Sequence, residues 1–227
     1  MEETRHAYSE KLKDLEQDLL RMGVAVEEAI AKAVEALKLR NTKLAEDVMA
    51  NDDVIDELDV VIEMKCLQLI ALQQPMAKDL RVIGTVLKII TDLERMGDHA
   101  YDIAKIAKAL GKDPIPFPLD DMVGMAELSK RMVKRAVDSF INHDIDLAHK
   151  VLEDDDAVDE MYIRVFDRLT AFIKSEPDQA VLAAHLLMVD RLLERISDHA
   201  TNIVERVAYM ETGNLKELRP TKDFGTN

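Results

Sequence analysis

The residues best suited to chemistry in this sequence are carboxylates spaced four residues apart. Glu94 and Asp98 form one such pair, and Asp102 extends it by four more residues. Four residues make about one helical turn, so on a helix these side chains project from the same side. Like charges at this spacing destabilise a helix by roughly 0.2–0.5 kcal/mol per pair. A single pair is usually a solvated acidic face, but a pair that recurs indicates that something offsets the charge.

The spacing recurs at four places, with two pairs in each half of the chain. Arg95 and Arg195 stand beside two of the pairs, but a neighbouring residue points about 100° away on a helix, so we expect each arginine to serve both carboxylates poorly. We therefore predict that metal ions bind on the outer surface of the helices. Oxygen ligands suit iron, zinc, manganese or magnesium and do not select among them. The predicted ligands are Asp52, Asp56, Glu94, Asp98 and Asp102 in the first half, and Asp155, Asp159, Glu194 and Asp198 in the second.

The two halves of the chain repeat each other. The segment 93–100 returns at 193–200 with six of eight residues identical, and the block 52–57 returns at 155–160. His99 and His199 occupy matching positions, where we expect packed, hydrogen-bonded side chains rather than metal ligands. Asn202 stands where the first copy has Asp102, so equal metal loading of the two halves is not expected. The repeat predicts two units of the same fold.

Apolar spacing predicts the helices that position these acids. Apolar residues alternate at intervals of four and three along 82–110 and again along 182–210, which is typical of packed helices. Earlier stretches from Val48 to Leu69 and from Val151 to Phe172 each predict one helix, and first helices are expected over 9–39 and 121–142. We predict an all-α protein of two pseudo-symmetric antiparallel three-helix bundles with six long helices. The expected divisions are 1–112 for the first repeat, 113–120 for a proline-rich linker, 121–212 for the second repeat and 213–227 for a flexible tail.

Composition excludes several classes of function. The formal net charge is −15, which opposes binding to nucleic acid and to anionic membrane surfaces. The single cysteine, Cys66, lies among apolar residues and is expected to be a buried thiol. The first residues lack the features of a signal peptide, and no apolar run is long enough to span a bilayer. We expect a cytoplasmic protein without direct membrane insertion.

These motifs resemble the PhoU family. The resemblance rests on segment 93–98 and its copy, on block 52–56 and its copy, on segment 74–81 at a helix start, and on the opening Thr4-Arg5-His6. It implies a cytoplasmic regulator, not an enzyme, that restrains phosphate-starvation signalling. It also implies partners, namely the ATPase subunit of a Pst phosphate transporter and a membrane-bound sensor histidine kinase. Family members can hold metal clusters on the paired motifs, and a homodimer is expected.

Two other functions compete with this one. A carboxylate-bridged di-metal enzyme on a helical bundle would carry inward-pointing Glu-x-x-His motifs, whereas Gly97 and Ser197 stand three residues after Glu94 and Glu194. The other is a helical scaffold that binds no metal. Elemental analysis of the purified protein separates this scaffold from a metal-binding regulator.

Overall fold

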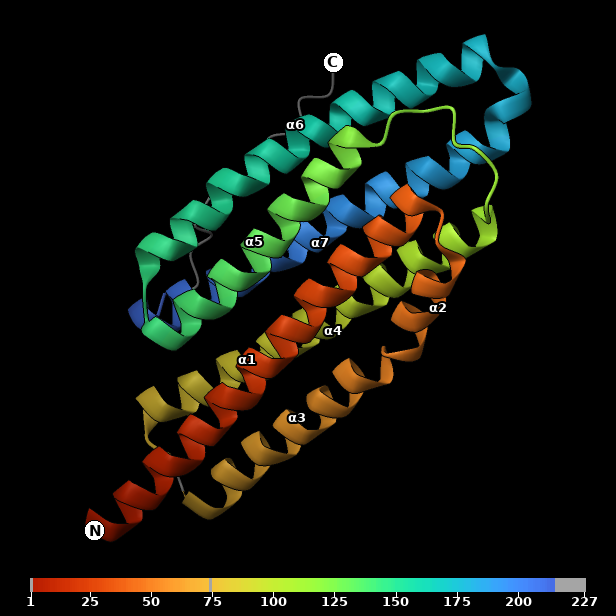
Figure 1. Cartoon of the computed structure of the whole chain (residues 1–227). Coiled ribbons are helices and arrows are strands. Elements are labelled where there is room, and N and C mark those ends of the chain that lie inside the picture. The colour runs from red at the N-terminus through yellow and green to blue at the C-terminus, as the bar shows by residue number, and fades with distance from the viewer. Residues whose placement is uncertain (1, 74, 215–227) are drawn as a thin grey trace.

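Helices account for most of the chain that the structure describes. The computed structural model describes residues 2–73 and 75–214, and it contains no β-strand in these two ranges. The predicted tail lies outside the described residues from residue 215 onward. Figure 1 shows the helices in two groups that lie beside each other. The prediction of an all-α fold is confirmed.

Each group is a bundle of antiparallel helices. The first contains α1 (Glu2–Leu39), α2 (Thr42–Ala50), α3 (Asp53–Gln73) and α4 (Ala77–Leu110). The second contains α5 (Asp120–Asn142), α6 (Ile145–Ser175), a 3₁₀ turn at Pro177–Gln179 and α7 (Ala180–Thr212). The six long helices are those predicted. The prediction of one unbroken helix from Val48 to Leu69 is wrong, because the chain breaks between α2 and α3.

Local signals account for several of the helix ends. Asn41 caps α2 by accepting a hydrogen bond from the backbone N–H of Leu44, and Asp144 caps α6 in the same way. The segment between α4 and α5 holds three prolines, which cannot donate backbone hydrogen bonds to a helix. Gly111, just before them, has a φ of +65°, which glycine adopts without strain.

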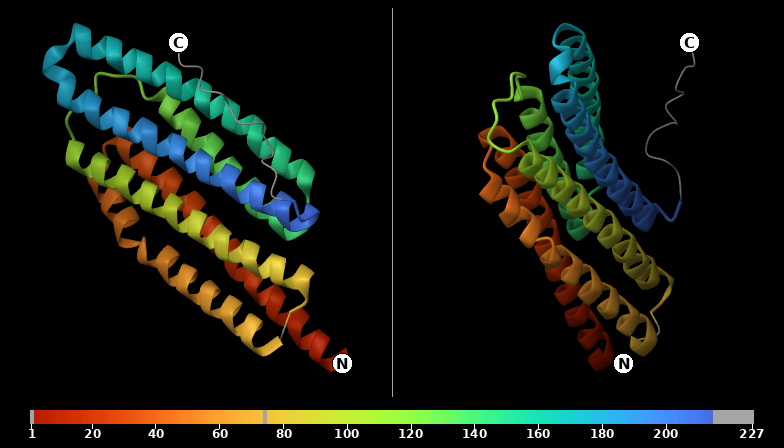
Figure 2. Two further views of the ribbon diagram at one scale, coloured as in Figure 1. Left: turned by 180° about the vertical axis from the view of Figure 1, so that it is seen from behind. Right: turned by 90° about the vertical axis from the view of Figure 1, so that its right-hand side faces the viewer.

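The two bundles pack against each other over much of their length. Helix α4 lies against α7, and α1 lies against α5, so that buried residues of both bundles form one hydrophobic core (Figure 2). This core is mostly Leu, Ile, Val, Met and Ala, as expected from an aromatic content of only 4%. Cys66 is buried in it, and burial raises the pKa of its thiol to about 12, as expected for an unreactive thiol. Within the described residues, no helix is long and apolar enough to cross a membrane.

Candidate functional site

The break between α2 and α3 positions the first acidic residues. At Asn51 the side-chain amide donates a hydrogen bond of 2.6 Å to the backbone oxygen of Asp47, and α2 ends there. An asparagine that binds the backbone in this way competes with continued helix formation. Asp52 follows, and Asp53 and Asp56 occupy the first turn of α3, where the positive end of the helix dipole stabilises negative charge. The dipole therefore compensates part of this acidic charge without any ligand.

Five predicted ligands gather where the start of α3 faces α4. Burial raises the pKa of Asp52 to about 6, together with the nearby charges of Asp56, Asp98, Asp53 and Asp102. The pKa of Glu94 is also raised, by burial first and then by Asp98 and Asp56. These mutual effects show that carboxylates from two helices lie close together. We call this group the first acidic cluster, which comprises Asp52, Asp56, Glu94, Asp98 and Asp102.

Arg95 neutralises part of this cluster. Its Nη1 lies 2.8 Å from Asp98 Oδ2, and its Nε lies 3.3 Å from Glu94 Oε2. We expected Arg95 to serve both carboxylates poorly, but it lies within ion-pair distance of each. The reason is that a long, flexible side chain can bend back along the helix surface from a position 100° away. Arg95 thus supplies part of the positive charge that offsets the repulsion between these carboxylates.

We call the predicted ligands on α6 and α7 the second acidic cluster, which comprises Asp155, Asp159, Glu194 and Asp198. Burial raises the pKa of Glu194 to about 7, to which the charges of Asp198 and Asp159 add, while Arg191 opposes the shift. Asp155 is only 5% exposed, so the prediction of an outer surface is wrong for this residue. Asp155 stands four residues after Val151 and three before Val158, which is a core-facing position of α6.

A buried carboxylate that the sequence analysis missed lies next to this second cluster. Asp190 on α7 has no exposed surface, and neither side-chain oxygen has a hydrogen-bond partner. Burial raises its pKa to about 8, and the charges of Glu194 and Asp121 add to the shift. Its counterpart in the first repeat is Ile90, 100 residues earlier. A comparison of the two helices residue by residue, beyond the apolar stripes, would have shown that an aspartate replaces this isoleucine.

The histidines at matching positions of the two repeats meet where α4 packs against α7. The ring centroids of His99 and His199 lie 5.5 Å apart. His199 Nδ1 is 2.9 Å from Asp92 Oδ1, which confirms a hydrogen-bonded side chain. His99 has no such carboxylate because Leu192 stands at the counterpart of Asp92, and burial lowers its pKa to about 4. The histidines therefore belong to the contact between the two bundles.

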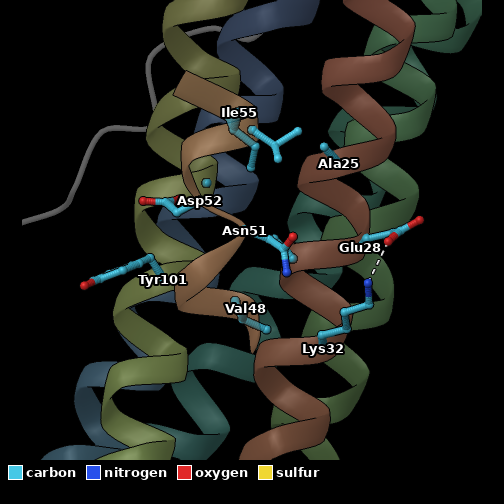
Figure 3. Close-up of a pocket in the computed structure, with 11 residues that line it drawn as sticks. Ala25, Glu28, Lys32, Val48, Asn51, Asp52, Ile55 and Tyr101 are labelled. Atoms are coloured by element: carbon cyan, nitrogen blue, oxygen red, sulfur yellow. Dashed lines mark hydrogen bonds and ion pairs between the residues drawn. The ribbon is translucent and has the colours of Figure 1, made fainter. Parts of the chain in front are cut away.

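A pocket opens beside the α2–α3 break. It has a volume of about 160 Å³ and is lined by α1, by both sides of the break, and by Gly97 and Tyr101 of α4. Figure 3 shows the Glu28–Lys32 ion pair at the α1 side, whereas the carboxylate of Asp52 points away from α1. A Cβ atom on Gly97 would lie 3.0 Å from Ile55 Cδ1, so glycine permits the close approach of α3 and α4.

Neither cluster forms a closed metal site in this arrangement of side chains. Over residues 2–73 and 75–214, no group of three or more His, Cys, Asp and Glu side chains is placed so that it could hold a metal ion. The carboxylates do gather on neighbouring helices, as predicted, but arginines bind several of them. Metal binding at these residues stays a prediction.

The sequence matches a known family over both repeats. The PhoU domain family matches residues 19–107 and again residues 122–207. A PhoU homolog of Clostridium acetobutylicum, named as a phosphate-specific transport system accessory protein, is 38% identical over 95% of this chain and 99% of its own length. A protein of the same name from Aquifex aeolicus is 42% identical over 95% of this chain and 97% of its own length.

Solved structures show the same fold. The crystal structure of PhoU from Pseudomonas aeruginosa superposes with a TM-score of 0.87 at 34% sequence identity and covers 91% of this chain and 100% of its own. That of the phosphate transport regulatory protein PhoU from Streptococcus pneumoniae has a TM-score of 0.84 at 30% identity, covering 93% of this chain and 100% of its own. The relatives carry the names of accessory and regulatory proteins.

Proposed function

Because this chain belongs to the PhoU family, we propose that it regulates phosphate transport as an adaptor and restrains phosphate-starvation signalling while phosphate is plentiful. Its partners in this proposal are the ATPase subunit of a Pst-type transporter and a membrane-bound sensor histidine kinase. In this proposal the protein contacts the cytoplasmic faces of both partners and is therefore cytoplasmic. The action is docking rather than catalysis.

One observation carries the proposal. Relatives named as phosphate transport accessory proteins align with this chain over nearly the whole of both lengths, so both repeats are retained. The structure adds a physical reason for a docking role. Each bundle presents acidic side chains from two neighbouring helices, which suits recognition by charge.

We further propose that the two acidic clusters bind divalent or trivalent metal ions. The donor set fits, because carboxylate oxygens are the ligands that magnesium, manganese and iron accept, and zinc accepts them too. The raised pKa of Asp52 supports this, since a cation nearby would offset the repulsion that raises it. Side chains now bound to Arg95 would have to turn toward the ion. A bound metal would neutralise the acidic surface and so favour contact with a partner.

The adaptor proposal is tested by affinity purification of the tagged protein from phosphate-replete and phosphate-starved cells. We expect transporter ATPase and kinase components to copurify when phosphate is plentiful and to be reduced after starvation. Deletion of the gene is expected to switch on starvation-response genes in the presence of phosphate. Recovery of neither component, together with unchanged gene expression, would reject the adaptor role.

The metal proposal is tested separately, by elemental analysis and calorimetric titration with manganese, zinc, magnesium and iron salts. Glu94→Gln/Asp98→Asn is expected to lose metal bound by the first cluster. A matched control, Glu35→Gln/Asp146→Asn, removes the same two charges from exposed positions elsewhere and is expected to bind normally. Equal binding by both variants, or no binding by the wild type, would favour the metal-free scaffold.

A homodimer is also part of the proposal. The start of α7 exposes an apolar patch around Val181 and Met188, which are 73% and 57% exposed. The side chains that line this patch are free of acidic groups, so a second copy with the same net charge can approach it. Sedimentation velocity at several concentrations checks this. We expect Val181→Gln/Met188→Gln to be monomeric under conditions where the wild type dimerises.

A further inference from the structure

Helix α3 exposes an apolar stripe that no other part of the described chain covers. Its members face away from α1 and α4, and each keeps about half of its surface exposed: Val60 is 57% exposed, Val61 45%, Met64 51% and Leu67 48%. The opposite side of the same helix is buried through Ile55, Ile62, Cys66 and Leu69. A helix that is apolar on both sides is normally covered on both sides.

The corresponding face of α6 shows that the fold does not require this stripe. With the offset of 103 residues between the repeats, Val61, Met64 and Leu67 correspond to Arg164, Asp167 and Thr170, whereas Val60 corresponds to Ile163, which is itself 59% exposed. Both helices pack in their own bundles, and three of the four apolar positions on the outer face of α3 are polar on α6. The stripe is therefore not explained by folding, and methionine and leucine at such a surface are suited to docking a partner.

Charge around the stripe indicates what kind of partner fits. Helix α3 carries five acidic residues and one basic residue, Lys65, which is already bound to Asp18 of α1. Glu57 and Glu63 are exposed; at 100° per residue, Glu57 lies in line with the stripe one turn before Val61, and Glu63 lies along one side of it. A second copy of this chain would bring its own net charge of −15 to this acidic border and be repelled.

We propose that the outer face of α3, formed by Val60, Val61, Met64 and Leu67 and bordered by Glu57 and Glu63, docks a basic amphipathic helix of a partner protein. The apolar side of that helix covers the stripe, and its lysine or arginine side chains reach the two glutamates. This inference rests on the proposed function in one respect, because it assigns a docking surface to the adaptor. The surface lies outside the metal-ligand pairs.

The test measures binding of a synthetic 20-residue helical peptide with leucines on one side and lysines at its borders. Met64→Gln/Leu67→Gln is expected to weaken the Kd at least tenfold. The matched control Ile163→Gln/Phe166→Gln removes two side chains of similar exposure, 59% and 46%, from α6, and is expected to change the Kd less than twofold. Both variants alter only exposed positions, and circular dichroism checks that each remains folded. An equal loss in both variants, or no loss in either, overturns the proposal.

Two further arms test the charge and the identity of the occupant. A peptide with glutamate in place of each lysine is expected to bind at least tenfold more weakly than the lysine peptide, and Glu57→Gln/Glu63→Gln is expected to reduce that difference. Equal binding of the two peptides rejects a basic partner. Sedimentation velocity shows whether wild-type self-association depends on Met64 and Leu67, and such a dependence would assign the face to a second copy instead. The peptide assay uses neither phosphate nor transporter, so the surface can be confirmed even if the adaptor function fails.

Discussion

The α2–α3 break and the middle of α6 occupy equivalent places in the two bundles, yet their contents differ. In the first bundle, Glu28 and Lys32 of α1 pair with each other across from Asn51, and a pocket remains between them and the break. In the second bundle the counterparts of these three residues are Arg131, Arg135 and Asp154, and they bind one another. Asp154 accepts hydrogen bonds from Arg131 Nε at 3.1 Å and Arg131 Nη2 at 2.7 Å, and also from Arg135.

This difference shows how similar apolar patterns can give unequal helices. Asp154 is satisfied by arginines of α5, so the backbone around it can continue as a helix. Asn51 lacks such partners and binds the backbone of its own helix, which ends α2. The second bundle also buries Asp190 where the first has Ile90. Titratable side chains are therefore buried in the second bundle at places where the first is open or apolar.

The largest expected effect concerns the buried carboxylate, tested with Asp190→Asn. Its pKa of about 8 when folded, against 3.8 as the ordinary value, means that the folded state holds a proton that the unfolded state releases. Stability from this group is full below pH 4 and is lost as pH rises toward 8. Asparagine cannot ionise, so relative to wild type the variant should gain about 3.5 kcal/mol between pH 5 and pH 8, since each pH unit contributes up to about 1.4 kcal/mol and the contribution falls off near both pKa values. Urea unfolding at both pH values measures it.

The control is the counterpart residue in α4. A conservative change of Ile90 to Val should change the free energy of unfolding equally at pH 5 and pH 8, because isoleucine does not ionise. A difference between Asp190→Asn and wild type that is the same at pH 5 and pH 8 would mean that Asp190 is ionised in the folded protein, contrary to its lack of hydrogen-bond partners.

A smaller effect, this time a loss of stability, is expected from Asp154→Ala, which removes the carboxylate bound by two arginines. Two guanidinium groups then lose their shared partner, but Arg131 and Arg135 keep 49% and 31% of their side-chain surface exposed and can be solvated. We therefore expect about 2–3 kcal/mol of lost stability, below the range for fully buried pairs. Asn51→Ala is the matched change in the first bundle and should cost less than about 1 kcal/mol. Similar losses for the two variants would remove the contrast between the bundles.

The sequence predicted the long helices correctly because their apolar spacing is regular in both repeats. It did not predict the break at Asn51, because Val48 and Ile55 lie seven residues apart and the apolar pattern continues across it. Where α2 ends, Asn51 pairs with the backbone of Asp47, and apolar spacing does not report such a hydrogen bond. The positions of helices with regular apolar spacing are thus easier to predict from sequence than the local hydrogen bonds that interrupt them.

The acidic clusters were predictable as groups but not in their surroundings. The four-residue spacing predicted that Glu94 and Asp98 lie on one side of their helix, and the repeat predicted the same arrangement for Glu194 and Asp198. The partners of these groups depend on where flexible side chains reach, as for Arg95, and on burial, as for Asp155. Asp155 had a visible signal, since it lies on the apolar stripe of its helix, whereas nothing in the spacing indicated how Arg95 would bend.

A third test transfers a feature of the second bundle to the first with Gly97→Ser. The first bundle has Gly97 beside Ile55, whose Cδ1 would be 3.0 Å from a new Cβ, and the counterparts of these two residues in the second bundle are Ser197 and the smaller Val158. Overpacking of this kind should cost about 1–2 kcal/mol. Ile55→Val in the same chain should recover part of the loss, because it restores the pair found in the second bundle. Thermal unfolding of both single variants and the double variant gives the coupling, and simple additivity would contradict direct contact as the cause.

The smallest expected effect is that of Asp52→Asn, which tests whether repulsion between the carboxylates of the first acidic cluster destabilises the folded protein. The pKa of Asp52 is raised to about 6 by burial and by neighbouring carboxylates, so its ionisation above that pH is unfavourable in the folded protein. Because the side chain is partly exposed and water screens the charges, we expect a gain of only about 0.5 kcal/mol at pH 7.5, with no gain at pH 4. Added manganese or magnesium should abolish the gain if the wild-type cluster binds the ion, since the cation then stabilises the same carboxylate that the variant lacks. Denaturation at pH 7.5 with chelator and with metal compares the two cases, and a gain that metal leaves unchanged would separate the repulsion in this cluster from metal binding.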